Sequence, residues 1–221
     1  PTHVMDLPQL PDQWEAQRNW TDMLRKLKAF LETTFNTEIT NESIERQIKE
    51  TNARNRLMNR IFDYAALCPP VISWSEMYDV IALAFVSSAA ELEAQLHPLF
   101  DKLEARRTQG IFFGRPNAPR VMVSGCPLGG DSTKVFKIIE EAGGVVVALD
   151  ACSGFKCFSF QIEEDTDDPL AAIARAYLQI PCSCMTPNQR RLDKMSETIE
   201  RFKPNVVVDA ILHACHSYNI E

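Results

Sequence analysis

The sequence predicts an α/β fold, in which a helical segment is followed by a mostly parallel open sheet with helices on both faces. All eight glycines lie between Gly110 and Gly154, so residues 1–109 contain none and carry apolar residues at helical spacing. From residue 119 onward, short apolar runs alternate with helical patterns, as in parallel strands joined by helices. The composition, 45% hydrophobic and 24% charged over 221 residues, is typical of a globular chain with a sizeable core.

The glycine-free part is predicted to form about four helices. The first carries apolar residues three and four positions apart, namely Trp20, Leu24, Leu27 and Leu31. The second begins after Thr40 or Asn41, either of which is able to cap its first turn, and ends before the prolines at positions 69 and 70. Its apolar stripe includes Thr51 and Asn55, which are either hydrogen-bonded in the core or face a ligand cleft.

Two capping boxes divide residues 74–107 into two further helices. Ser73 precedes Glu76 and Ser88 precedes Glu91, at the spacing that lets each pair bond reciprocally to backbone N–H groups. Residues 108–119 are rich in glycine and proline, which is typical of a loop. We therefore expect a helical segment over residues 1–118, made of the last part of an earlier domain and linking helices, and an α/β domain over residues 119–221.

The second half alternates strands and helices. Strands are expected at residues 120–124, 145–149 and 206–212, with a further short strand at 178–180, and helices at residues 132–142, 168–177 and 187–202. This order is typical of Rossmann-like or flavodoxin-like sheets, in which all strand carboxyl ends lie along one edge. The extended start at residues 1–8 and the stop just past an apolar strand also lead us to expect a central fragment of a longer protein, with the α/β domain truncated.

Six of the seven cysteines follow residue 120, and four of them come within three residues of an expected strand end: Cys126, Cys152, Cys182 and Cys215. We expect the four loops that carry them to converge at one sheet edge. Thiolates gathered from several loops suit a soft metal or an iron–sulfur cluster. For Cys126, in a tight turn before Pro127, packing is the alternative, and Cys157 beside Phe158 is expected to pack as a small hydrophobic residue. The chain has no Cys-x-x-Cys pair, so a zinc ribbon is poorly supported.

Two further groups stand at the same expected edge. His213, His216 and Tyr218 follow the last strand. A histidine there either donates a proton, or hydrogen-bonds to a cluster sulfur, or only caps the strand end. The glycine turn at residues 125–130 has Asp131 where a nucleotide-hydrolysing loop needs lysine. That turn either holds an anionic group on its N–H groups or is only a tight turn.

The net charge of −7 disfavours nonspecific binding to nucleic acid and to anionic membrane surfaces. No apolar run approaches the roughly 20 residues that a membrane span needs, and no signal peptide opens the sequence. We therefore expect a cytoplasmic protein with no membrane or nucleic-acid partner. In a reducing compartment, seven cysteines are not expected to form a disulfide framework.

Several strings of the second half resemble the 2-hydroxyacyl-CoA dehydratase and benzoyl-CoA reductase superfamily. They are Gly-Cys-Pro-Leu-Gly-Gly at residues 125–130, Cys-Ser-Gly-Phe-Lys at 152–156, Cys-Ser-Cys-Met-Thr-Pro-Asn at 182–188 and Cys-His-Ser-Tyr-Asn at 215–219. The strings at residues 182–188 and 215–219 look most like the branch called double-cubane cluster proteins, which are often labelled dehydratase subunits. With the start of the chain and the helix that carries Asn52 and Arg56, the resemblance covers nearly all 221 residues.

The resemblance implies an iron–sulfur subunit whose cofactor is a [4Fe-4S] or a double-cubane cluster. It implies an ATP-hydrolysing iron–sulfur activator as partner, a homodimer or a related second subunit, and either dehydration of a 2-hydroxyacyl-CoA thioester or reduction of a small molecule. Cys152, Cys184 and Cys215 match ligand positions, with Cys182 close behind. Two other readings remain: a non-catalytic α/β binding module with structural cysteines, and a zinc or thiol-redox protein.

Overall fold

The computed structural model describes residues 1–220 and divides the chain into two compact units. Unit 1 consists of Pro1–Asn52 and Phe160–Arg191, and unit 2 of Ala53–Ser159 with the segment from Leu192 onward. These units do not follow the expected division between residues 118 and 119, because the helices after residue 53 share one hydrophobic core with the sheet. Over residues 1–220, no helix combines the length and the apolar character needed to cross a bilayer.

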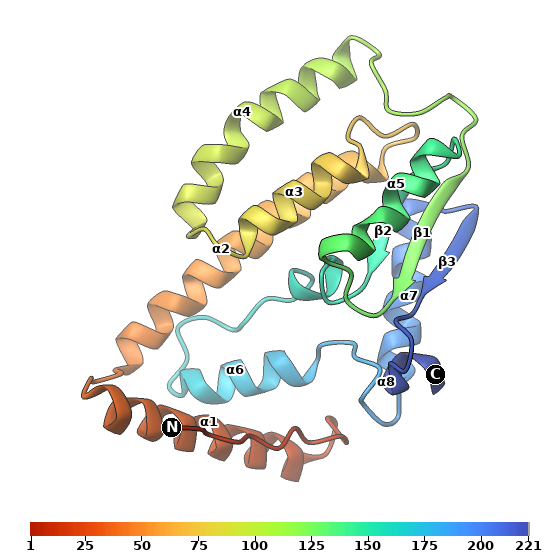
Figure 1. Ribbon diagram of the computed structural model, residues 1–221. Helices are drawn as coiled ribbons and strands as arrows, with labels where there is room; N and C mark the ends of the chain where they lie inside the picture. The colour runs from red at the N-terminus through yellow and green to blue at the C-terminus, as the bar shows by residue number, and fades with distance from the viewer. Residues whose placement is uncertain (221) are drawn as a thin grey trace. The chain divides into compact units, whose positions relative to one another are not determined.

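Unit 1 contains α1 (Trp14–Phe35), the first part of α2 (Asn41–Ala66) and α6 (Pro169–Leu178). Helices α1 and α6 lie side by side (Figure 1) and are joined by an ion pair of 2.6 Å between Arg25 and Asp168. Asp168 also caps α6 by accepting from the N–H of Ala171, and the Thr40 hydroxyl accepts from the N–H of Ser43 at the start of α2. The expected helices of this unit and the cap expected at Thr40 are therefore confirmed, and the cap at Asp168 is an addition from the structure.

The helices of unit 2 begin at the capping boxes that the sequence predicts. Helix α3 (Trp74–Ala84) starts after Ser73, whose hydroxyl accepts from the N–H of Glu76 while its own N–H donates to the Glu76 carboxylate. Helix α4 (Ala89–Thr108) starts with the same reciprocal pair between Ser88 and Glu91. The Glu76 carboxylate further accepts two hydrogen bonds from Arg106 on α4, at 2.8 and 2.9 Å, so one side chain both caps α3 and ties it to α4.

The sheet of unit 2 has three parallel strands in the order β2-β1-β3. These are β1 (Arg120–Gly125), β2 (Val145–Asp150) and β3 (Val206–Ala210). After the 3-10 turn η1 (Gly130–Thr133), helix α5 (Lys134–Glu141) connects β1 to β2, and α7 (Gln189–Phe202) precedes β3. Because β2 and β3 flank β1 on opposite sides, right-handed crossovers place α5 and α7 on opposite faces. The expected α/β class, with helices on both faces of an open parallel sheet, is confirmed.

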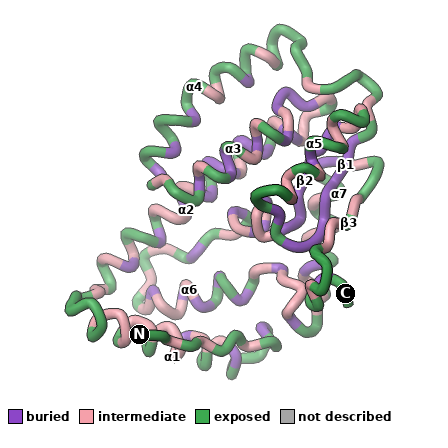
Figure 2. The backbone as a smooth tube through the Cα atoms, viewed as in Figure 1, coloured by how far each residue is buried: buried purple, intermediate pink, exposed green. Residues whose placement is uncertain are grey.

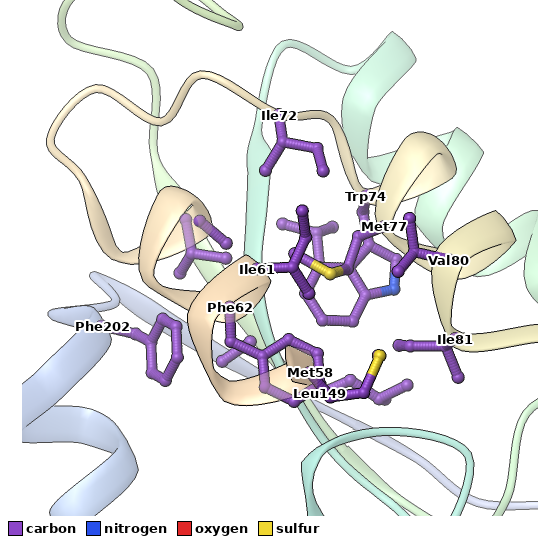
Figure 3. Close-up of a cluster of buried hydrophobic side chains, with 14 of the residues drawn as sticks. Met58, Ile61, Phe62, Ile72, Trp74, Met77, Val80, Ile81, Leu149 and Phe202 are labelled. Carbon is purple, nitrogen blue, oxygen red and sulfur yellow. The ribbon is translucent and has the colours of Figure 1, made fainter. Parts of the chain in front are cut away.

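The sheet and the helices of unit 2 enclose one apolar core. Strands β1 and β2 are buried along their whole length, whereas β3 is largely exposed (Figure 2). Figure 3 shows Met58, Ile61 and Phe62 of α2 beside Trp74 of α3 and Leu149 of β2. Since all five side chains are almost fully buried, α3 and the part of α2 from Ala53 onward share their core with the sheet.

The short strand expected at residues 178–180 is wrong. Leu178 is the last residue of α6, and the N–H groups of Gln179 and Ile180 donate back to the carbonyls of Ala176 and Tyr177. The apolar run arises because Leu178 packs as a fully buried helix residue. Residues 181–185 therefore follow a helix in unit 1 and not a strand of the sheet.

Arg120 joins the amino end of β1 to the ends of two helices. Its side chain is only 7% exposed and donates to the carbonyls of Phe202 at 2.6 Å and of Leu67 at 2.8 Å, and more weakly to those of Ala66 and Lys203. These carbonyls lie at the carboxyl ends of α2 and α7, where no backbone N–H of the next helical turn is available to donate to them. A positively charged donor is therefore favourable there. One buried guanidinium thus fixes both helix ends against the sheet.

We expect Arg120→Met to destabilise the protein by about 3 kcal/mol or more, because the buried carbonyls at two helix ends lose their donors. Urea unfolding followed by circular dichroism measures this. Arg115→Met, which removes an exposed arginine from the preceding loop, is the matched control and should leave the unfolding midpoint unchanged. Equal effects of the two substitutions would contradict the role given to Arg120.

The Glu76 carboxylate predicts a pH dependence of stability. The hydrogen bonds from Arg106 lower the pKa of Glu76 from 4.5 to about 2. Glu76→Gln keeps a capping acceptor but removes the charge, so it should cost about 1–2 kcal/mol at pH 7 after allowance for solvent screening. A carboxylate whose pKa is lowered by folding stabilises the folded state at pH values above its unfolded pKa. The difference in unfolding free energy between wild type and Glu76→Gln should therefore shrink as pH falls from about 4.5 towards 2. Urea unfolding across this range, with Glu93→Gln as an exposed control, tests it.

Candidate functional site

Three of the four predicted cysteine loops lie at the carboxyl edge of the sheet. Cys126 comes directly after β1, Cys152 shortly after β2, and Cys215 after β3, immediately before the short helix α8 (His216–Ile220). The register pairs Ser124 of β1 with Asp150 of β2 and Gly125 of β1 with Ala210 of β3, so the three strands end together. The fourth loop, which carries Cys182, follows α6 and belongs to unit 1.

The thiol of Cys126 has a structural role. It is 1% exposed, its sulfur accepts a hydrogen bond of 3.0 Å from the N–H of Leu212, and it donates to the carbonyl of Ala210. Gly125 before it has a φ of 129°, and a side chain there would strike the Ala210 carbonyl. The glycine–cysteine turn therefore clamps the exit of β1 to the exit of β3.

Cys157 is also engaged. It lies in the 3-10 turn η2 (Phe155–Cys157), and its thiol donates a hydrogen bond of 2.6 Å to the carbonyl of Cys152. Burial raises the pKa of the Cys157 thiol to about 11, so the group is a neutral donor at physiological pH. Its place in the fold is to close the turn that presents Cys152.

Cys152 and Cys215 are half-buried, as Cys157 is, whereas Cys126 is buried. Cys215 starts α8, since the N–H of Asn219 donates to its carbonyl at 2.9 Å. His213 and His216 on the same loop are exposed, whereas Tyr218 is buried. Of these three side chains, Tyr218 is the one that is buried, and its hydroxyl accepts a hydrogen bond from Lys156.

Cys182 and Cys184 form a pair in unit 1. Their sulfurs lie 3.3 Å apart, both residues are half-buried, and the turn between them is closed by the N–H of Met185 donating to the Cys182 carbonyl. The next residue, Thr186, donates its N–H to the carbonyl of Gln9, which anchors the loop to the start of the chain. This arrangement presents two thiols in one direction from a short loop.

The described residues provide thiols suited to iron or zinc but no complete ligand set. Within residues 1–220, no three His, Cys, Asp or Glu side chains are grouped so as to hold a metal ion. Unit 1 offers the half-buried pair Cys182 and Cys184, and unit 2 offers Cys152 and Cys215. A four-thiolate cluster therefore needs ligands in addition to those that either unit brings together.

The sequence reasoning missed a buried polar network beside these thiols. Lys156 is 3% exposed and donates to the hydroxyl of Tyr218 at 3.0 Å, and its ammonium lies 3.3 Å from the carboxylate of Asp150. The Ser124 hydroxyl lies 3.5 Å from the same carboxylate. The sequence contains one pointer to it, an aspartate that ends an apolar strand six positions before a lysine in a Gly-Phe-Lys-Cys turn.

Two cavities bear on whether Thr51 and Asn55 face a ligand cleft and on whether the glycine turn at residues 125–130 binds an anion. Thr51 lines a mostly apolar cavity of about 380 Å³ in unit 1, between α1, α2 and α6, whereas Asn55 is fully buried. The glycine turn of unit 2 borders a cavity of about 390 Å³. The N–H of Gly129 is taken by the hydroxyl of Ser132, which favours a tight turn over an anion-binding loop.

Comparison with known proteins gives a consistent result. Residues 1–221 match the family described as "2-hydroxyglutaryl-CoA dehydratase, D-component". The chain is 34% identical, over 223 aligned residues, to the Escherichia coli (strain K12) protein named "Putative dehydratase subunit YjiM". That similarity covers 100% of this chain and 57% of the relative, so the chain spans little more than half the length of the relative.

The environments of the thiols predict an order of reactivity. In metal-free protein at pH 8, iodoacetamide should alkylate the exposed Cys68 rapidly and Cys157 roughly 10- to 100-fold more slowly, because the raised pKa leaves little thiolate. Cys126 should be equally protected by burial. Peptide mass spectrometry after timed quenching measures each rate, and modification of Cys157 as fast as that of Cys68 would refute the assignment.

Proposed function

The chain belongs to the 2-hydroxyglutaryl-CoA dehydratase D-component family, and from that premise we propose that its thiols help to hold an iron–sulfur cluster in a 2-hydroxyacyl-CoA dehydratase-like enzyme. The cysteines Cys152, Cys184 and Cys215 are the proposed ligands, with Cys182 as a fourth candidate. The remaining ligands would come from parts of the longer protein or from a second subunit. The cofactor would be a [4Fe-4S] or a double-cubane cluster.

One observation carries this proposal: the four candidate ligands are half-buried on loops, with Cys152 and Cys215 after strand ends and the sulfurs of Cys182 and Cys184 3.3 Å apart. The thiols of Cys126 and Cys157 bond to backbone carbonyls and brace loops at the strand ends. Loops anchored to rigid strands and helices are suited to hold thiolates at fixed positions. The geometry therefore supports the ligand choice that the family resemblance implies.

The cluster would supply low-potential electron transfer, with an ATP-hydrolysing iron–sulfur activator as electron donor and a 2-hydroxyacyl-CoA thioester as substrate. We propose a homodimer or a pair of related subunits in the cytoplasm, where a reducing environment keeps thiols free. The role of the chain's own residues is to bind and orient: the strand ends position Cys152 and Cys215, and the turn at residues 182–185 positions the other pair. The reaction would be that of a lyase or of an ATP-dependent reductase.

A second candidate function is reduction of a small molecule that carries no CoA thioester. The Cys-Ser-Cys string at residues 182–184 and the Cys-His-Ser-Tyr-Asn string at 215–219 favour it, because they resemble the double-cubane branch. Assays of the activated protein with a 2-hydroxyacyl-CoA and with small reducible molecules would separate the two candidates. A non-catalytic binding module would show neither activity.

The test of the cofactor is the metal content of the full-length protein purified without oxygen. We expect brown protein with iron and acid-labile sulfide in equal amounts. Colourless protein without iron would refute the proposal, and zinc in place of iron would favour a zinc or thiol-redox protein.

Single substitutions then test the ligand set. Cys215→Ala and Cys184→Ala should each lower the iron content by roughly half or more, because a lost thiolate opens one corner of a cluster. Cys68→Ala, at the exposed end of α2, is the matched control and should leave iron unchanged. Full iron content in both ligand variants would place the ligands elsewhere.

A further inference from the structure

A buried ammonium group stands at the carboxyl edge of the sheet in unit 2. The side chain of Lys156 is 3% exposed, and that of its partner Asp150 is 9% exposed. Lysine is almost never buried without a partner, because removing its charge from water is costly. The burial of the Lys156 ammonium is therefore explained by its two polar partners, Asp150 and Tyr218.

These partners lie on segments that follow different strands. Asp150 is the last residue of β2 and lies opposite Ser124 of β1 in the register. Tyr218 belongs to α8, which follows β3, and accepts a hydrogen bond of 3.0 Å from the ammonium. The ammonium also lies 5.1 Å from the centre of the Tyr218 ring. One side chain thus joins the exits of β2 and β3.

The same two exits carry half-buried thiols. Cys152 lies between Asp150 and Lys156, in a turn closed by the N–H of Gly154, which donates to the Ala151 carbonyl at 2.9 Å. Cys215 begins the helical turn that contains Tyr218. The network thus fixes the backbone on either side of Cys152 and just after Cys215, and it leaves both sulfurs half-buried.

We infer that Lys156 is a positioning residue, which holds the Cys152 loop and the Cys215 loop in a fixed relation by binding Asp150 and Tyr218 at once. Stability alone does not explain the arrangement, because apolar side chains of similar volume commonly stabilise a core as well as a buried ion pair does. A hydrogen-bonded charge instead specifies one geometry. The role of Lys156 in fixing the two loops is independent of the proposed function. Only the further statement that the positioned thiols bind a metal rests on that function.

The experiment measures alkylation of individual thiols in the full-length, metal-free protein. Tyr218→Phe keeps the ring and removes only the acceptor oxygen, and the double variant Lys156→Met/Asp150→Asn removes both buried charges together. In both we expect Cys215 to react roughly tenfold faster than in the wild type, because a hydrogen bond to a charged group no longer opposes opening of the loop. Cys68 is the internal control, and its rate should not change.

Further variants separate positioning from folding. Lys156→Met alone leaves the Asp150 charge buried and should lower the unfolding midpoint, whereas the double variant should recover stability without recovering the protection of Cys215. Lys156→Arg, which keeps the charge, should restore protection of Cys215. The matched control Lys137→Met, on the exposed side of α5, should change neither quantity.

An unchanged Cys215 rate in Tyr218→Phe and in the double variant would overturn the inference. A rate that rises only together with those of Cys126 and Cys157 would also overturn it, since that result reports general unfolding. The iron content of the wild-type protein is measured in parallel. Faster alkylation of Cys215 in the variants, with no iron in the wild type, would support the positioning role and refute the cluster. Iron in the wild type, with unchanged alkylation in the variants, would support the cluster and refute the positioning role.

Discussion

Unit 2 depends on the contact between the Arg120 guanidinium and the carbonyls that end α2 and α7. Strand β1 is the central strand of the sheet and, like β2, is buried along its whole length, so an anchor at its amino end constrains the strand with which both neighbours pair. A cation there satisfies acceptors that two helices leave open, and it does so without a carboxylate among the partners described above. The thiols lie at the opposite edge of the sheet, at the carboxyl ends of the strands that this contact anchors.

At the carboxyl edge, neighbouring cysteines have different tasks because their surroundings differ. Cys126 and Cys157 use their sulfurs to hold backbone, and the loops that they brace carry Cys152 and Cys215. A cysteine that braces a loop and one proposed as a ligand look alike in a sequence, and only their surroundings in the fold separate them. The buried pair of Lys156 and Asp150 adds a charged contact to this framework.

Much of the fold was predictable from local rules. The capping boxes at Ser73 and Ser88 marked helix starts because the spacing of serine and glutamate is itself the hydrogen-bonding motif. The strand expected at residues 178–180 failed because a short apolar run at a helix end is indistinguishable from a buried strand by composition. The role of Lys156 was not predictable, since a lysine in a turn is usually exposed and its partner Tyr218 is distant in sequence. Position after strands pointed correctly to Cys152 and Cys215, whereas Cys182 was placed after a strand that is a helix end and Cys184 came only from the family resemblance. The separation of the candidates into two units required the structure.

Unit 1 is assembled from two stretches of chain that enclose most of unit 2 in the sequence, and Arg25 pairs with Asp168 across 143 residues. During synthesis on a ribosome, α1 therefore emerges long before α6, and its apolar stripe has to wait for a partner that has not yet been made. The helices α3 and α4, by contrast, find each other locally through Glu76 and Arg106. Within these residues, the order of translation thus favours early structure in α3 and α4 and leaves the apolar stripe of α1 exposed until α6 has been made.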